Sequence, residues 1–226
     1  MSETWTDEFF LGYVETHSAT DRALFSPEHA ERLYRLAGFE PFWQGPKRFV
    51  ALHEDAALPL VRLARLSPLG RFYSGSGVDS ADRTFENILA FDDDQMEKTH
   101  DYIQWLFPNP EPSQWNPQAP LLSEKDILDF KKDPGLREQS FKAFTRWMDF
   151  MEASSQWCTP RNHNHLRITR IIRFLTLTEQ SNEGGQVYHT ACGMMEKHCG
   201  DYFPATTESF WKEARNLKPA WLTETS

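Results

Sequence analysis

The stretch from Asp92 to Pro108 constrains the fold more than any other part of the sequence. Three acidic residues begin it, with carboxylates suited to capping a helix and to the positive end of its dipole. Pro108 ends it by lacking a backbone N–H. Between residues 102 and 107 nearly every side chain is large and apolar, which leaves no wide face for water. We therefore predict one helix over residues 92–107, with its second half inside a domain.

Helical spacing gives this stretch two neighbouring faces. The apolar face consists of Met96, His100, Ile103 and Phe107. The polar face consists of Glu97, Asp101 and Gln104. An imidazole is therefore expected within an apolar stripe, next to carboxylates.

Capping residues, prolines and apolar periodicity predict further helices along the chain. They cover residues 7–16, 27–37, 59–66, 83–91, 123–132, 133–154, 164–175, 187–198 and 208–216, with Gly184 and Gly185 separating two of them and Thr206 or Thr207 capping the last. A strand pattern is visible only at residues 48–52, and residues 39–46 are expected to form a loop. The predicted fold class is all-α, with about seven to nine helices.

Two other segments set the expected domain organisation. Residues 69–82 contain turn-forming glycines, so we place a boundary there, between a helical N-terminal extension (1–69) and a main domain (70–226). Residues 108–120 hold five prolines and should form an extended connecting arm over the surface of the main domain.

Composition excludes several classes of function. The net charge of −9 argues against a nucleic-acid-binding surface, since phosphate contacts need a positive field. No apolar run reaches the ~20 residues of a membrane-spanning helix, and the first residues do not form a secretory signal. The three cysteines, Cys158, Cys192 and Cys199, form no CxxC pair. A soluble, cytoplasmic protein is expected.

A second motif follows from Arg161 to Leu175. Asn162 or Asn164 can cap its helix, and isoleucines and Leu175 would bury one side. His163, Arg167 and Arg170 line up along another side, which gives a half-buried cationic row.

These two motifs resemble the conserved region of the opioid growth factor receptor family. Residues 100–108 (HDYIQWLFP) and 163–171 (HNHLRITRI) are similar to the two signatures of that family, and the resemblance extends over about residues 70–215. It implies a helical domain and, in the animal members, a receptor for the enkephalin pentapeptide that associates with the nuclear envelope and restrains growth. The short form here is similar to bacterial or fungal members.

The charges of the two motifs are complementary and allow two interpretations. In one, Glu97 or Asp101 forms a structural ion pair with Arg167 or Arg170 across a helix contact. In the other, these arginines receive the carboxylate of a small molecule or short peptide in a pocket. The candidate ligand-binding residues are then His100, Tyr102, Gln104, Trp105, His163, Asn164, Arg167 and Arg170.

Histidines offer a third interpretation. His100, His163 and His165 could bind a divalent metal or a haem iron and support a histidine-dependent enzyme. Lone histidines are more often held by hydrogen bonds within a core, so we expect no cofactor. The leading hypothesis is a ligand- or peptide-binding domain. A structural interaction protein, using residues 1–69 or the proline-rich arm to contact a partner, is the remaining alternative.

Overall fold

The computed structural model describes residues 5–18, 23–39, 50–52 and 54–217. Residues 40–46 of the expected loop lie outside these ranges. The chain divides into two compact units, residues 1–71 and 72–226. Within the described residues there are twelve α-helices, one short 3-10 helix and two three-residue strands. The all-α class is therefore confirmed, with the chain divided into more helices than expected.

The first unit consists of three helices and a small two-stranded sheet. Its elements are α1 (Asp7–Ser18), β1 (Ala23–Phe25), α2 (Pro27–Leu36), β2 (Val50–Leu52) and α3 (Glu54–Arg65). The strands pair antiparallel, with Phe25 opposite Val50. Ser26 caps α2, because its hydroxyl accepts the His29 N–H at 3.2 Å. β2 lies within the predicted strand, whereas β1 was not predicted.

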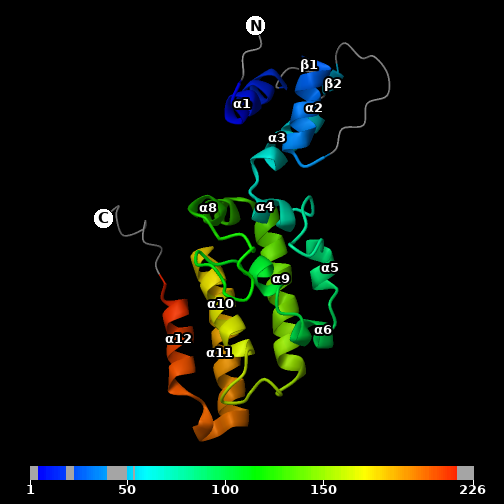
Figure 1. Ribbon diagram of the computed structural model, residues 1–226. Helices are drawn as coiled ribbons and strands as arrows, with labels where there is room; N and C mark the ends of the chain where they lie inside the picture. Colours follow the sequence, from blue (N-terminus) through cyan, green and yellow to red (C-terminus); the bar gives the residue numbers. More distant parts are fainter. Residues whose placement is uncertain (1–4, 19–22, 40–49, 53, 218–226) are drawn as a thin grey trace, which may run out of the picture. The chain divides into compact units, whose positions relative to one another are not determined.

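The second unit contains the remaining helices, beginning at the end of α4, which crosses the division (Figure 1). They are α4 (Pro68–Tyr73), α5 (Phe85–Leu89), α6 (Asp93–Lys98), α7 (Ile103–Leu106), α8 (Glu124–Lys132), α9 (Pro134–Ala153), α10 (Asn164–Leu177), α11 (Ser181–Cys199), η1 (Gly200–Tyr202) and α12 (Ala205–Arg215). Both α11 and α12 pack against α10, which makes α10 the central element.

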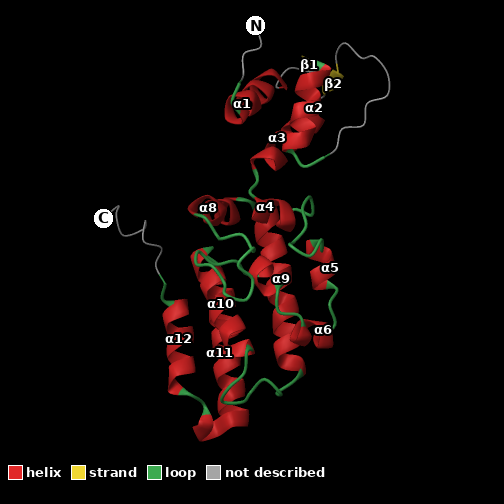
Figure 2. Cartoon of the chain, in the orientation of Figure 1, coloured by secondary structure: helices red, strands yellow, loops and turns green. Residues whose placement is uncertain are grey.

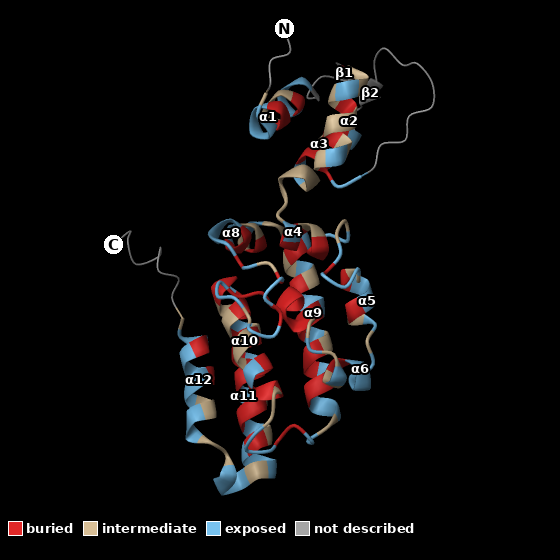
Figure 3. Cartoon of the chain, in the orientation of Figure 1, coloured by how far each residue is buried: buried red, intermediate tan, exposed pale blue. Residues whose placement is uncertain are grey.

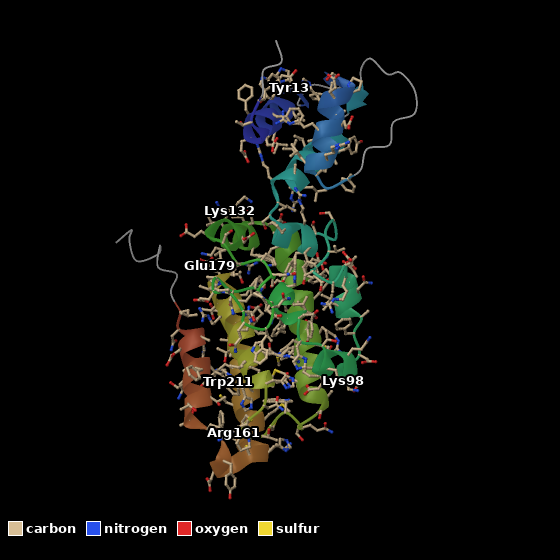
Figure 4. The ribbon with its side chains drawn as sticks, viewed as in Figure 1. Tyr13, Lys98, Lys132, Arg161, Glu179 and Trp211 are labelled. Carbon is tan, nitrogen blue, oxygen red and sulfur yellow. The ribbon has the colours of Figure 1, made fainter. Side chains whose placement is uncertain are left out.

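Aromatic rings form the core of this unit. Tyr73, Phe107, Phe130 and Phe174 are fully buried, and the Phe130 ring meets the rings of Tyr73 and Phe174 edge-on at centroid distances of 4.8 and 5.2 Å. The outer helix α12 is mostly exposed, in contrast to α10 (Figure 3). Trp211 is its main buried residue, and its indole N–H donates to the His165 carbonyl oxygen at 3.1 Å (Figure 4).

The single helix predicted over residues 92–107 is wrong, because the structure interrupts it between Lys98 and Ile103. Thr99 has an extended backbone with φ −87° and ψ 129°. The Arg167 side chain donates to the carbonyl oxygens of Met96 and Thr99 at 2.9 and 2.7 Å. Because Arg167 donates to these carbonyl oxygens, they do not require the N–H groups of a further helical turn. The chain can therefore leave the helix without burying unpaired oxygens.

Gly184 and Gly185 do not separate two helices, as we had expected. They lie inside α11, and the break occurs earlier, where Glu179 adopts a left-handed backbone with φ 58°. A Cβ atom on Gly184 would lie 3.4 Å from Leu175 Cβ, so glycine allows α11 to approach α10 closely. The predicted caps Thr206 and Thr207 also lie inside their helix, which begins after Pro204.

The proline-rich arm, residues 108–120, forms neither helix nor strand, as expected (Figure 2). It connects α7 to α8. None of the helices in the described part of the chain is both long and apolar enough to cross a lipid bilayer.

Candidate functional site

A cavity of about 630 Å³ lies between α7, α10 and the proline-rich arm. We call it the arm cavity. It is lined by His100, Ile103, Gln104, Asn109, Pro112, Ser113, Gln114, Trp115, His163, Leu166, Arg167, Thr169, Arg170 and Arg173. Its size falls within the range of small-molecule sites in proteins.

Polar contacts attach the arm to both helices. The Asn116 amide donates to the Asp101 carbonyl oxygen at 2.8 Å, and the Gln104 amide donates to the Ser113 hydroxyl at 3.2 Å. Arg173 on α10 forms an ion pair with Glu111 at 2.5 Å. The arm is therefore a fixed wall of the cavity.

Arg167 is buried, and its guanidinium is held by oxygens of the protein. Nη1 donates to the Met96 carbonyl at 2.9 Å and to the Asn164 side-chain oxygen at 3.0 Å, and Nη2 donates to the Thr99 carbonyl at 2.7 Å. The guanidinium also lies 5.6 Å from the centre of the Tyr102 ring. Burial lowers the pKa of Arg167 from its ordinary value, while the charges of Tyr102 and Glu97 oppose this effect.

The expected ion pairs between the two motifs are therefore wrong. The Glu97 carboxylate accepts the Asn164 amide N–H at 2.9 Å, and Asp101 pairs with Arg83 at 2.8 Å. Because α6 ends at Lys98, backbone carbonyl groups face Arg167 and take the place of a carboxylate.

Arg170 and Arg173 continue the row of Arg167 along α10. Arg170 has only a long contact, 3.4 Å from Nη1 to the Phe107 carbonyl oxygen. Burial lowers the pKa of Arg170, the neighbouring charge of Arg173 lowers it further, and Glu111 opposes both. Arg173 also has a buried Nε that donates to no group among the described residues. These two guanidinium groups retain hydrogen-bonding capacity on the cavity side.

The histidines form two separate environments. The rings of His100 and His163 stack with centroids 5.0 Å apart, and His163 Nε2 lies 3.4 Å from Glu97 Oε1. His100 Nδ1 donates to the Lys98 carbonyl oxygen at 2.8 Å. Burial and the Arg167 charge lower the pKa of His163, and the Glu97 charge opposes them.

His165 lies elsewhere and meets the Trp157 and Trp211 rings edge-on, at 6.4 and 5.7 Å. The metal-ligand set His100, His163 and His165 therefore does not converge on one point. No group of three or more histidine, cysteine, aspartate or glutamate residues suited to a metal is found within the described ranges. The three histidines of that alternative are therefore not arranged as one set of metal ligands.

Three candidate ligand-binding residues lie behind the cavity wall. Tyr102 is fully buried beneath Arg167, and burial raises its pKa. Trp105 packs against Phe72 with ring centroids 5.3 Å apart, and Asn164 is committed to Glu97 and Arg167. The other candidates, His100, Gln104, His163, Arg167 and Arg170, do line the cavity.

The arm residues and Arg173 were not among the residues predicted for the site. A signal for Arg173 was present, because it follows Arg167 and Arg170 at the same three-residue spacing. Trp115 and Leu166 are 68% and 62% exposed, and they form apolar parts of the lining. Which face of the arm meets α10 depends on long-range contacts that no local pattern encodes.

Two carboxamide groups of the lining are incompletely paired. Gln104 and Asn109 are only 4% and 6% exposed. Gln104 Oε1 and Asn109 Oδ1 are buried and accept no hydrogen bond from the part of the chain that the structure describes. These two oxygens can therefore accept hydrogen bonds that the described residues do not supply.

Comparison with known proteins identifies similarity in the middle of the chain. Residues 71–156 match the family model described as "Opioid growth factor receptor (OGFr) conserved region". The chain is 33% identical to the opioid growth factor receptor of Rattus norvegicus over 101 residues, which cover 36% of this chain and 17% of that protein. For the Homo sapiens receptor the identity is 31%, over 36% of this chain and 15% of that protein. The chain thus spans about a sixth of these relatives, and no solved structure matches it.

Proposed function

This chain belongs to the opioid growth factor receptor conserved-region family through residues 71–156, and from that premise we propose that it is a ligand-binding domain. The ligand would occupy the arm cavity and combine a negative charge with a flat apolar group. The single observation that carries this proposal is a cavity lined by three arginines and, among the described residues, by no carboxylate.

The charge of the lining contrasts with that of the whole chain. The chain has a net charge of −9, yet the arm cavity brings together Arg167, Arg170 and Arg173. Glu111 meets Arg173 from the arm, and Arg170 has no comparably short contact to a carboxylate among the described residues. A bound carboxylate would supply the missing opposite charge through paired N–H donors.

The apolar part of the lining supports the second half of the proposal. Ile103, Pro112, Trp115 and Leu166 present aliphatic and aromatic surface to the cavity. A ring placed against Trp115 would remove apolar area from water, at a gain of about 25 cal/mol per Å². The mammalian relatives are named as receptors for a growth factor. A short peptide with a ring and a free carboxylate would combine both features.

A titration with benzoate tests this proposal most directly. We expect benzoate to shift the amide NMR signals of Arg170, Thr169 and Trp115 in a saturable way, whereas neutral benzyl alcohol should shift them much less. Arg170→Gln should weaken benzoate binding about tenfold, because it removes charged hydrogen-bond donors of the lining that make one long contact among the described residues.

Arg161→Gln is the matched control, since Arg161 is exposed and lies outside the cavity lining. It should bind benzoate as the wild type does. If benzoate and benzyl alcohol bind equally, or if neither shifts the cavity signals, the proposed function is wrong.

A further inference from the structure

We infer that the arm cavity recognises an α-amido carboxylate, meaning a ligand in which an amide N–H stands next to the anionic group. This inference rests on the proposed function and names its ligand class. N-acyl amino acids and the free C-terminus of a peptide both contain this chemistry.

Two oxygens of the cavity lining lack a hydrogen-bond donor among the described residues. Gln104 Oε1 belongs to α7 and Asn109 Oδ1 to the arm, and both residues line the cavity. A buried oxygen without a donor costs about 1–3 kcal/mol. A simple carboxylate would not relieve this cost, because it brings only acceptors to a place that already has two.

The protein has few donors to offer these oxygens. Arg167 is fully engaged with the carbonyl groups at the end of α6 and with Asn164. The Ser113 hydroxyl oxygen accepts from the Gln104 amide and from the Trp115 N–H, both at 3.2 Å. A molecule that enters the cavity can supply the missing donors, in place of the water that would otherwise fill it.

The charges of the three arginines restrict the kind of hydrogen-bond donor that this molecule can carry. An ammonium group would be repelled by three guanidinium charges in the same cavity. A neutral N–H is not repelled. In a trans secondary amide the N–H points away from its own C=O, so it can donate to an oxygen of the lining without bringing a second acceptor there. The carboxylate is then held by Arg170 and the unpaired Nε of Arg173, and the single amide N–H is shared between the Gln104 and Asn109 oxygens. One compact group thus supplies both the negative charge and the donor.

The test compares two ligands that differ in a single atom. N-benzoylglycine carries a ring, an amide and a carboxylate, whereas O-benzoylglycolate has an ester oxygen in place of the N–H. By calorimetry or NMR titration we expect the amide to bind about tenfold more tightly than the ester. Equal affinities would overturn the inference. If benzoate binds and neither longer acid does, the inference fails and the proposed function stands; if none of the three binds, both fail.

A variant of one lining residue tests whether Asn109 causes the preference for the amide over the ester. Asn109→Leu removes the carboxamide at similar size, and it should abolish the preference for amide over ester while leaving the affinity for the ester unchanged. A purely structural role for Asn109 would weaken both ligands equally and would count against the inference. Gln104→Met provides the same measurement at the second oxygen if the Asn109 variant does not fold.

Gln139→Met is the matched control. Gln139 Oε1 is also buried without a partner among the described residues, but Gln139 lies on α9, outside the cavity lining. This variant should keep the tenfold preference. If it loses the preference as Asn109→Leu does, the effect is not local to the cavity and the inference is wrong.

Comparison of N-benzoylglycine with a longer analogue tests whether the ligand is a free N-acyl amino acid or the C-terminus of a peptide. N-benzoyl-triglycine models the end of a peptide chain, while N-benzoylglycine models a free N-acyl amino acid. Comparable affinities would support a peptide C-terminus as the ligand, and a marked preference for the shorter acid would support an N-acyl amino acid. Converting the carboxylate of N-benzoylglycine to a carboxamide should remove most of the affinity, and unchanged binding would overturn the inference.

Discussion

Two regions along the same face of α10 differ in whether their buried polar groups are hydrogen-bonded. At the first, Arg167 is surrounded by the Met96 and Thr99 carbonyl oxygens and by Asn164, which accept its hydrogen bonds. At the second, Gln104, Asn109 and Arg173 each keep a buried polar atom with no partner in the described chain. A buried charge alone therefore does not identify a binding site. What our proposed site adds to a buried charge is a pair of lining carboxamides, Gln104 and Asn109, with unmade hydrogen bonds.

The largest effect expected from this comparison is on stability at the first region. Arg167→Met should lower the free energy of unfolding by about 3 kcal/mol, because the buried carbonyl oxygens lose their donors. Arg170→Met should lower it by less than about 1 kcal/mol, since Arg170 makes only one long contact within the described ranges. Urea denaturation measures both. If Arg167→Met keeps full stability and loses only ligand affinity, Arg167 binds the ligand and does not stabilise the fold, contrary to our assignment.

The next effect concerns pH. Burial lowers the pKa of His165 below its ordinary value, while a hydrogen bond to the Trp157 backbone partly opposes this. The unfolded chain then binds a proton more readily than the folded one, so the contribution of His165 to stability is present above about pH 6.5 and is lost as pH falls below it. His163 acts in the same direction.

Denaturation at several pH values should show this loss. His165→Phe keeps the aromatic contacts with Trp157 and Trp211, and it should give a shallower fall in stability between about pH 7.5 and 5 than the wild type. His198→Phe, at an exposed position on α11, serves as the control and should retain the wild-type slope. A wild-type slope in His165→Phe would show that this histidine is not protonated more readily in the unfolded chain.

The smallest effect concerns the ion pair between Arg173 and Glu111, whose side chains are 28% and 60% exposed. Glu111→Gln should change stability by no more than about 0.5 kcal/mol, as is usual for an exposed pair. It should strengthen benzoate binding about two- to threefold, because Arg173 becomes free to pair with the ligand. Glu138→Gln, which breaks an exposed pair with Lys142 on α9, should leave binding unchanged. Weaker binding in Glu111→Gln would mean that the arm needs this contact to form the cavity wall.

Local patterns in the sequence predicted much of the helical structure. Ser26, Ser123 and Asp133 cap the helices expected after them, because a capping hydroxyl or carboxylate acts on N–H groups only two or three residues away. The break after Lys98 could not be predicted in this way. It depends on Arg167, some seventy residues later in the chain, which binds the carbonyl groups of Met96 and Thr99.

The candidate site was predicted only in part, because local patterns indicate which face of a helix a residue lies on but not which distant residues it contacts. Helical spacing correctly brought His163, Arg167 and Arg170 to one side of α10, and five of the eight selected residues line the cavity. The partners of the arginines were wrong, since charge complementarity does not distinguish a carboxylate from a row of backbone carbonyl groups. Asn109 and Ser113 could not be selected, because loop residues carry no periodicity that indicates which way they face.

The five prolines of the arm also bear on the kinetics of ligand entry. Each proline fixes one backbone dihedral angle, and the contacts of Asn116 and Glu111 hold the arm against its neighbours. A wall that is rigid beforehand loses little conformational entropy when a ligand arrives. Association should then proceed in one step, at a rate that rises in proportion to ligand concentration, with differences between ligands expressed mainly in how long they stay bound.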